Sequence, residues 1–145
     1  MEALLYQVNY SANIGMIIRT AVGFNISKLY FYDPKEILIK KQKQIRNVSQ
    51  GTIDKIEIIT ITNPNNFLEK YKGRKIATIC GDSKAIELKQ FTPNKTDLVI
   101  FGNERGLPKE IIELCETKIN ISLVNELNSL NLACAFSIIA YKYSN

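Results

Sequence analysis

The stretch INISLVNELNSLNLACAFSIIAYKY, residues 119–143, determines how the rest of this chain must be arranged. Apolar and polar residues alternate over Ile119–Leu123, which predicts a β-strand. A polar elbow follows. The run Leu130–Tyr143 contains neither glycine nor proline and predicts a helix with Ser129 at its N-cap. The stretch therefore predicts a strand that leads through a short elbow into a helix.

The predicted helix Leu130–Tyr143 is apolar on nearly every face. Such a helix is either buried on all sides or immersed in a membrane. This one is too short to cross the ~30 Å hydrocarbon core of a bilayer. We therefore expect part of its surface, Phe136–Tyr141, to pack against a second copy of the chain in a homodimer.

The composition is that of an ordinary globular protein. The chain has 145 residues, 46% of them hydrophobic and 23% charged, which predicts a single domain over residues 1–145 with its own core. Its first residues lack the basic start and cleavage site of a signal peptide, and no apolar run is long enough for a membrane span. We expect a cytoplasmic protein that does not enter a membrane.

Cysteine and histidine usage narrows the possible chemistry. Cys80, Cys115 and Cys134 lie far apart in apolar surroundings, and we expect buried free thiols in a reducing compartment. The chain contains no histidine. Nucleophiles that a histidine activates are therefore excluded, and no residue spacing indicates a metal site.

Positive charge is in excess. The 19 Lys and Arg residues against 14 Asp and Glu give a net charge of +5, which favours a polyanionic partner such as RNA. The most basic stretch is Lys35–Gln50, whose cations are Lys35, Lys40, Lys41, Lys43 and Arg46. This stretch is either a solvated helix or loop, or a surface that contacts phosphates.

Strands and helices alternate along the chain. Together with Ile119–Leu123, strands are predicted at Ala3–Val8, Lys28–Tyr32, Ile56–Ile61, Lys75–Cys80 and Asp97–Phe101, and helices at Ile14–Phe24, Pro64–Tyr71 and Pro108–Glu116. This order predicts an α/β protein with a mostly parallel, six-stranded sheet and helices on both faces. The continuous apolar run of Asp97–Phe101 is expected at the centre of the sheet.

Glycine and small polar residues follow three of the predicted strands. They are Gly81-Asp82-Ser83, Gly102-Asn103-Glu104 and the elbow residues 125–129. Ligands of parallel sheets bind outside the carboxyl ends of the strands. These three loops therefore predict the position of the functional site.

A first candidate motif lies where the first predicted helix begins, with Asn13, Gly15 and Arg19. A glycine inside a helix costs ~1 kcal/mol relative to alanine, so we expect another segment to approach the backbone closely at Gly15. Arg19 lies among apolar residues. It is either a ligand-binding charge or a side chain that reaches solvent.

Two further motifs lie toward the C-terminus. Glu104 and Arg105 stand between Gly102 and Gly106 on a strand-to-helix turn, where tight backbone lets a ligand approach. The turn matches neither the phosphate-binding GxxxxGK[ST] pattern nor GxGxxG. Asn131, just inside a helix without a polar face, indicates a ligand contact or a buried hydrogen bond.

In this order, NIGMIIRTA (residues 13–21), FGNERGLP (101–108) and NSLNLA (128–133) resemble the three signature motifs of the SpoU branch of the SPOUT RNA methyltransferases. The resemblance covers essentially the whole chain. It implies a SPOUT fold with a C-terminal trefoil knot and a homodimer. It also implies S-adenosylmethionine as cofactor and a ribose 2′-hydroxyl of tRNA or rRNA as the methyl acceptor, with the tRNA wobble position as one candidate.

The resemblance also implies roles for individual residues. The catalytic set would be Arg19, Asn13, Glu104, Ser129 and Asn131. Cofactor contacts would come from Cys80, Gly81, Gly102, Ile121, Leu123, Ser129 and Leu130, and RNA contacts from Arg19, Lys40, Lys41, Lys43, Arg46 and Arg105. A guanidinium has a pKa above ~12 and is rarely a base, so Arg19 would stabilise the developing alkoxide or bind the adjacent phosphate.

Two residues depart from the family pattern. Ser11 and Ser122 stand where relatives usually have proline, and we expect looser loops at both positions. The extra RNA-binding domain of many relatives is also not expected in residues 1–145.

Two other functions fit the same residues. The first is a non-catalytic RNA-binding or ribosome-assembly factor that kept the fold, although such a module has no need of the whole catalytic set. The second is a small-molecule enzyme of the α/β type that uses Glu104 or Asp82 as a base.

Overall fold

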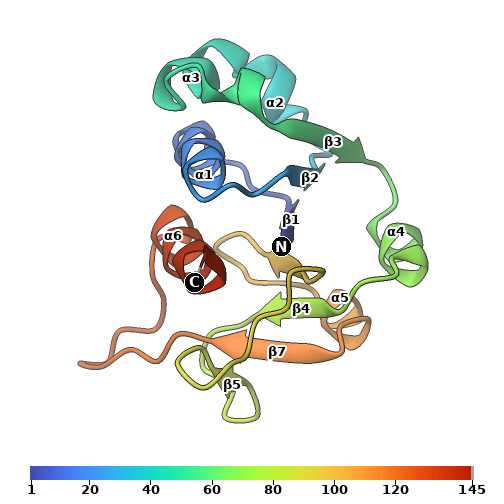
Figure 1. Ribbon diagram of the computed structural model, residues 1–145, viewed down its shortest axis with the longest axis vertical. Helices are drawn as coiled ribbons and strands as arrows, with labels where there is room; N and C mark the ends of the chain where they lie inside the picture. The colour runs from blue at the N-terminus through green and yellow to red at the C-terminus, as the bar shows by residue number, and fades with distance from the viewer. Residues whose placement is uncertain (145) are drawn as a thin grey trace.

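The computed structural model describes residues 1–144 and contains one seven-stranded sheet (Figure 1). The strands are β1 (Glu2–Tyr6), β2 (Lys28–Tyr32), β3 (Glu57–Ile61), β4 (Lys75–Thr78), β5 (Ile86–Glu87), β6 (Leu98–Phe101) and β7 (Thr117–Asn120). Their order across the sheet is β3-β2-β1-β6-β4-β7-β5, and every pair is parallel. The predicted α/β class and parallel sheet are confirmed, as is the central position of β6.

Helices cover both faces of the sheet, as predicted. They are α1 (Ser11–Gly23), α2 (Ile37–Lys40), α3 (Gln42–Val48), the 3₁₀ turn η1 (Thr52–Lys55), α4 (Pro64–Lys70), α5 (Lys109–Glu113) and α6 (Leu132–Ser144). Figure 1 places α1, α3 and α6 on one side of the sheet and α4 and α5 on the other. Each side buries its own core, the larger one beneath α1 and α6. Among residues 1–144, no helix has the length and apolar character needed to cross a bilayer.

The strand predictions were wrong at the last strands. A seventh strand, β5, lies where none of the six strands was predicted, and β7 covers Thr117–Asn120 instead of Ile119–Leu123. The pairing of β5 with β7 ends at Glu87 and Asn120. Among residues 1–144, no strand pairs with the chain beyond Asn120, so the apolar alternation continues in irregular backbone.

Helix α1 begins at Ser11 instead of Ile14, and α5 ends at Glu113 instead of Glu116, whereas α6 needs a correction of both its start and its cap. Helix α6 begins at Leu132, later than expected, and Ser129 is not its cap. The Asn131 side chain takes that role, because its Oδ1 accepts hydrogen bonds from the Ala133 and Cys134 amides at 2.8 and 3.3 Å. The motif NSLNLA therefore places three polar residues before the helix, and the last of them, Asn131, caps it.

Helix α6 is not uniformly buried. Phe136 is fully buried and stacks at 5.0 Å from Phe101, so it cannot contact a second subunit as expected. On the opposite side, Ile138 and Tyr141 are 42% and 60% exposed. The apolar residues of α6 thus divide between an internal face and a solvent-facing stripe.

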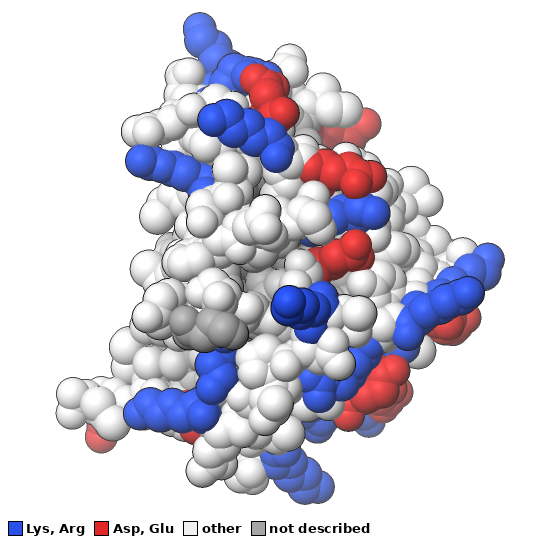
Figure 2. Space-filling model, in the orientation of Figure 1, with Lys and Arg blue, Asp and Glu red and all other residues white. Residues whose placement is uncertain are grey.

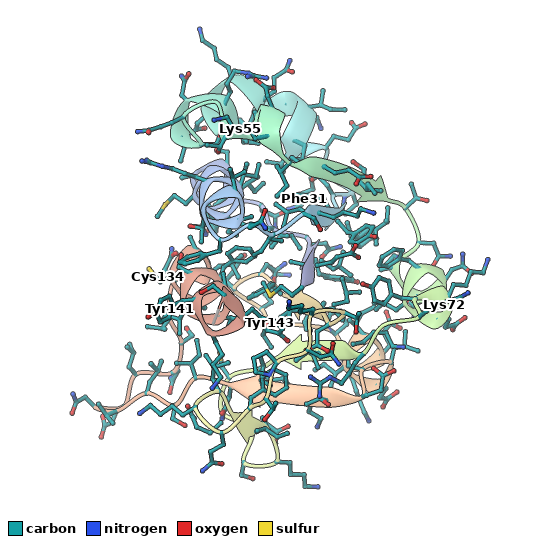
Figure 3. The ribbon with its side chains drawn as sticks, viewed as in Figure 1. Phe31, Lys55, Lys72, Cys134, Tyr141 and Tyr143 are labelled. Carbon is teal, nitrogen blue, oxygen red and sulfur yellow. The ribbon has the colours of Figure 1, made fainter. Side chains whose placement is uncertain are left out.

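The three cysteines are free, but their predicted burial is wrong for two of them. Cys80 and Cys134 are exposed, whereas Cys115 is half-buried. Cys80 lies beyond the end of β4, and Cys134 lies on the solvent side of α6 (Figure 3). The trefoil knot that the family resemblance implies stays a prediction.

Candidate active site

Four strands bring their loops to the carboxyl edge of the sheet. The loops follow β1, β4, β6 and β7, and three of them carry the predicted motifs. In a parallel sheet, these loops lie at one edge by construction. The edge thus collects the beginning of α1, Cys80-Gly81, the turn 102–106 and the segment 121–131.

A hydrogen bond joins the first and third motifs across 118 residues of sequence. Asn131 Nδ2 donates to Asn13 Oδ1 at 3.1 Å. Two further contacts follow along the same helix pair: the Thr20 and Ser137 hydroxyls lie 3.3 Å apart, and the rings of Phe24 and Tyr141 meet edge to face at 6.0 Å. Helices α1 and α6 therefore run parallel and in contact, with Asn13 and Asn131 at the site end.

Arg19 lies on the solvent-facing side of α1 and is exposed. Within residues 1–144 it makes no hydrogen bond or ion pair, and none joins it to Asn13, Glu104 or Asn131. A guanidinium without an internal partner is available to a phosphate or a developing negative charge.

The turn 102–106 is tight, as the two glycines predicted. A Cβ on Gly102 would lie 2.7 Å from the carbonyl carbon of Gly106, and Gly106 has a φ of +76°. Asn103 fixes the turn: its Oδ1 accepts from the Arg105 amide at 2.9 Å, and its Nδ2 donates to the Gln7 carbonyl at 3.1 Å. Glu104 is left exposed at the tip of the turn.

The segment 121–131 contains four of the expected cofactor contacts. Ile121, Leu123 and Leu130 are half-buried, and Ser129 is exposed. The segment is fastened where it begins, because Glu87 accepts hydrogen bonds from the Ser122 amide at 3.0 Å and from the Ser122 hydroxyl. Ser122 itself is therefore bonded, and the looser loop expected at this position stays a prediction.

Ser11, the other residue in place of a proline, also makes a contact. Its hydroxyl donates to Gln44 Oε1 at 2.6 Å and so links the first turn of α1 to α3. Ser11 is the first residue of α1, so it stands inside the helix and not in the preceding loop.

Asp82, an alternative base, is engaged in local bonds. A hydrogen bond from the Lys84 amide and an ion pair with Lys118 at 3.2 Å lower the pKa of its carboxyl. A carboxylate whose pKa is lowered is a weaker proton acceptor near neutral pH. The geometry therefore does not favour a small-molecule enzyme that uses this base.

The edge has two features that suit a ligand with hydrogen-bond donors. Asn120 Oδ1 is buried without a hydrogen-bond partner in residues 1–144, and a buried acceptor of this kind needs a donor. Beside β4, Gly81 has a φ of +71° and open space around its Cα, so a ligand can reach the backbone. No cluster of His, Cys, Asp or Glu in the described chain could hold a metal ion.

The basic residues lie away from the cofactor loops. Lys40, Lys41 and Lys43 line a shallow hollow of about 520 Å³ where α2 meets α3, at the opposite end of the molecule from β5 and β7 (Figures 1 and 2). Arg46 donates to both carboxylate oxygens of Asp54 at 2.7 and 2.9 Å. The charge of Arg46 is thus already paired, whereas Lys41 and Lys43 have no ion-pair partner among residues 1–144.

Three side chains organise the site without a role having been assigned to them from the sequence, although Asn103 lies in the predicted loop Gly102-Asn103-Glu104. Glu87 holds Ser122, Asn103 joins the turn to Gln7, and Asn120 carries the unpaired acceptor. Only Asn103 has a local signal, because an asparagine before a turn commonly bonds the backbone two residues on. The other two depend on a two-residue strand that periodicity cannot detect.

A parallel sheet whose carboxyl edge gathers three polar loops and, within residues 1–144, a buried acceptor without a partner defines an α/β protein with a candidate ligand site at that edge. More specifically, the chain belongs to the SpoU rRNA Methylase family, whose sequence model matches residues 1–141. The predicted family membership is thereby confirmed.

The similar proteins include both sequences and solved structures. A tRNA (guanosine(18)-2′-O)-methyltransferase of Aquifex aeolicus is 28% identical over 133 residues, covering 90% of this chain and 62% of that protein. The crystal structure of the A. aeolicus TrmH/SpoU tRNA modifying enzyme superposes with a TM-score of 0.86 at 26% identity, covering 98% of this chain and 72% of that one.

A second solved structure is similar over nearly the full length of both chains. It is described as giving insights into the 2-OH methylation of C/U34 on tRNA. Its TM-score is 0.86 at 25% identity, and the match covers 98% of this chain and 92% of that chain. By contrast, the chain spans only 52% to 62% of the length of the first curated relatives.

Proposed function

We propose that the protein methylates a ribose 2′-hydroxyl of RNA with S-adenosylmethionine. The observation that carries the proposal is the Asn131–Asn13 hydrogen bond, which joins two family motifs at the carboxyl edge of the sheet. Membership of the SpoU rRNA Methylase family supports the reaction class. Bound S-adenosylmethionine supplies an electrophilic methyl group.

The cofactor would be held by loops rather than by charged side chains. Backbone and apolar groups of Cys80, Gly81, Gly102, Ile121, Leu123 and Leu130 would enclose it, with Ser129 at the polar end. Asn120 Oδ1, which lacks a partner, is an acceptor suited to an amino or hydroxyl group of the cofactor.

The remaining catalytic work is positioning and charge stabilisation. A sugar hydroxyl is a poor nucleophile near pH 7, so its negative charge must be stabilised as its proton leaves. Arg19, unpaired and exposed, would bind the neighbouring phosphate or the developing alkoxide. Asn13 and Asn131 would orient the ribose, and Glu104 would complete the site from the turn 102–106.

The substrate we propose is tRNA, with the wobble nucleotide at position 34 as the first candidate. The support comes from the relative described as methylating C/U34 on tRNA, which matches this chain over 92% of its own length. The A. aeolicus relative named as a tRNA 2′-O-methyltransferase supports tRNA over rRNA. Lys40, Lys41 and Lys43 would contact phosphates away from the target, and Arg105 would do so beside it.

A homodimer completes the proposal. Cys134, Ile138 and Tyr141 occupy successive turns on the solvent side of α6, and Met16 is 46% exposed on the neighbouring α1. Such an apolar stripe on paired helices suits a self-complementary contact. We place the protein in the cytoplasm, where RNA substrates and free thiols both persist.

The deciding experiment incubates the protein with methyl-labelled S-adenosylmethionine and total tRNA, and maps positions that resist alkaline cleavage. Wild type should label one nucleotide, and Arg19→Ala should lose labelling by roughly 100-fold or more, the scale of removing one stabilising group. Isothermal titration should show that Arg19→Ala still binds the cofactor. Cofactor binding without labelling of any RNA would favour a non-catalytic RNA-binding factor.

Sedimentation tests the dimer separately. Ile138→Lys on the exposed side of α6 should convert the dimer to a monomer. Ile39→Lys is the matched control, because Ile39 is 68% exposed on α2, far from α6. A wild-type monomer at micromolar concentration would contradict the interface.

A further inference from the structure

We infer that Glu87 is a positioning residue for the cofactor-binding segment, acting through Ser122. The inference rests on the proposed function, because it assigns Ile121 and Leu123 to the cofactor pocket. Glu87 would not touch the cofactor. It would hold the backbone between those two contacts in the binding conformation.

The first observation is where the ladder between β5 and β7 stops. Glu87 pairs with Asn120, and the Leu88 amide donates to the Asn120 carbonyl at 2.8 Å. No strand pairing continues past this point. The Glu87 side chain takes over, because its Oε2 accepts from both the amide and the hydroxyl of Ser122. The Glu87 carboxylate therefore holds the backbone at Ser122, two residues beyond the last strand pair.

The second observation is how little else restrains this segment. Between residues 123 and 130, the only hydrogen bond in the described chain runs from the Leu127 amide to the Val124 carbonyl, at 3.3 Å. Val124 and Leu127 are 76% and 56% exposed. In Figure 1 the segment stands away from the body of the protein. Its conformation thus depends on its two ends, Ser122 on one side and Asn131 on the other.

The third observation concerns the residue type at position 122. A proline has no amide hydrogen and no hydroxyl, so it could make neither bond to Glu87. A proline would instead restrict its own φ angle. Serine with Glu87 is therefore an alternative way to hold the same backbone. The hydrogen bond from the Ser122 hydroxyl lowers the pKa of Glu87, as expected for a carboxylate that is held in its ionised form.

The test measures cofactor affinity by isothermal titration and turnover on tRNA. Glu87→Ala should raise the Kd and the KM for S-adenosylmethionine about tenfold, the effect of ~1.4 kcal/mol, while kcat at saturating cofactor changes less than about twofold. Glu87→Gln keeps an acceptor for the Ser122 amide and should recover most of the affinity. The matched control is Glu116→Ala, which removes a similar bond to the Lys75 amide (2.7 Å) at the opposite edge of the sheet.

A double-mutant cycle separates this role from general stability. In a Ser122→Pro background the bonds are already gone, so Glu87→Ala should change the Kd by less than about twofold. Native-state hydrogen exchange, measured without cofactor, should show a faster Ser122 amide in Glu87→Ala and unchanged core strands. Equal effects of Glu87→Ala in both backgrounds, or no effect in wild type, would overturn the inference. Failure of wild type to bind the cofactor would instead refute the proposed function.

Discussion

The hydroxyl of Tyr143 donates a 2.6 Å hydrogen bond to Oδ2 of Asp97, which fastens the last turn of α6 to the residue before β6. Asp97 is fully buried and also accepts two bonds from Arg74, at 2.9 and 2.8 Å. The far end of α6 is therefore anchored at the amino edge of the sheet. The site end of the same helix is anchored at the carboxyl edge through Asn131.

This anchor should be sensitive to acid. Burial alone would raise the pKa of Asp97, but hydrogen bonds from Arg74, Tyr143 and the Asn94 amide outweigh it and hold the pKa below its usual value. A carboxyl whose pKa is lower in the folded state stabilises the fold above its unfolded pKa of about 3.9, and this contribution is lost as pH falls further. Urea midpoints measured between pH 7 and pH 3 should therefore fall below about pH 4.

Two variants identify the group responsible. Asp97→Asn should cost about 2–3 kcal/mol at pH 7 and flatten the acid slope, since hydrogen bonds to a charged group are lost. Tyr143→Phe should cost about 1 kcal/mol and keep most of the slope. Asp82 and Glu87, whose pKa values are also lowered, would account for the slope that remains. An acid slope in Asp97→Asn as steep as that of wild type would assign the effect elsewhere.

Helices α1 and α3 are in close contact at Gly15. A Cβ at this position would lie 2.6 Å from the Cβ of Val48 and 3.1 Å from the Ile45 carbonyl oxygen. Gly15→Ala should therefore destabilise the protein by about 1–3 kcal/mol through overpacking, despite the better helix propensity of alanine. Gly23→Ala at the end of the same helix meets nothing within 4 Å and should be neutral or stabilise by up to ~1 kcal/mol. If the urea midpoints of Gly15→Ala and Gly23→Ala shifted in the same direction, the close contact between Gly15 and α3 would be refuted.

The three thiols should react differently with a cysteine reagent. Burial raises the pKa of Cys115 to about 12, so this thiol should stay unmodified at pH 7.5. Cys80 and Cys134 are exposed and should react. If α6 forms the dimer interface, Cys134 should become protected as protein concentration rises, whereas Cys80 should not. Mass spectrometry of alkylated peptides distinguishes the three positions, and a fast-reacting Cys115 would contradict its burial.

Most helices and strands could be predicted from the sequence, because their hydrophobic patterns and caps depend on residues that are close together in the chain. The strand Lys28–Tyr32 matches β2 at both ends, and α4 begins at Pro64 as predicted, with the Asn63 Oδ1 accepting from the Asn66 amide at 3.0 Å. The two-residue strand β5 escaped detection because alternation needs several residues to be visible. The predicted end of β7 was wrong because the last residue of β7, Asn120, pairs with Glu87 of β5, and β5 itself was not detected.

The site could be outlined from sequence, but its bonds could not. Motif order indicated that Asn13, Glu104 and Asn131 belong together, and the structure joins Asn13 to Asn131 directly. Glu87 and Ser122 are 35 residues apart, and no periodic pattern links them. Likewise, the all-round apolar character of α6 did not reveal which side is internal. Packing against Phe101 and α1 decides that Phe136 is buried and Tyr141 is not.

The hollow at α2 and α3 gives the last prediction, which concerns the salt dependence of RNA binding. Each phosphate contact that a lysine makes releases counterions, so log Kobs falls with log salt by ~0.7–0.9 per contact. Lys41 and Lys43 have no ion-pair partner in the described chain, so the double variant Lys41→Gln, Lys43→Gln should lower tRNA affinity and reduce the slope by about 1–2. Lys70→Gln, Lys72→Gln is the matched control, because both lysines line a similar hollow near α4 and neither has an ion-pair partner among residues 1–144. Figure 3 labels Lys72 beside α4. Filter binding across salt concentrations measures both slopes, and equal losses in the two variants would mean that net charge, not the α2–α3 surface, determines binding.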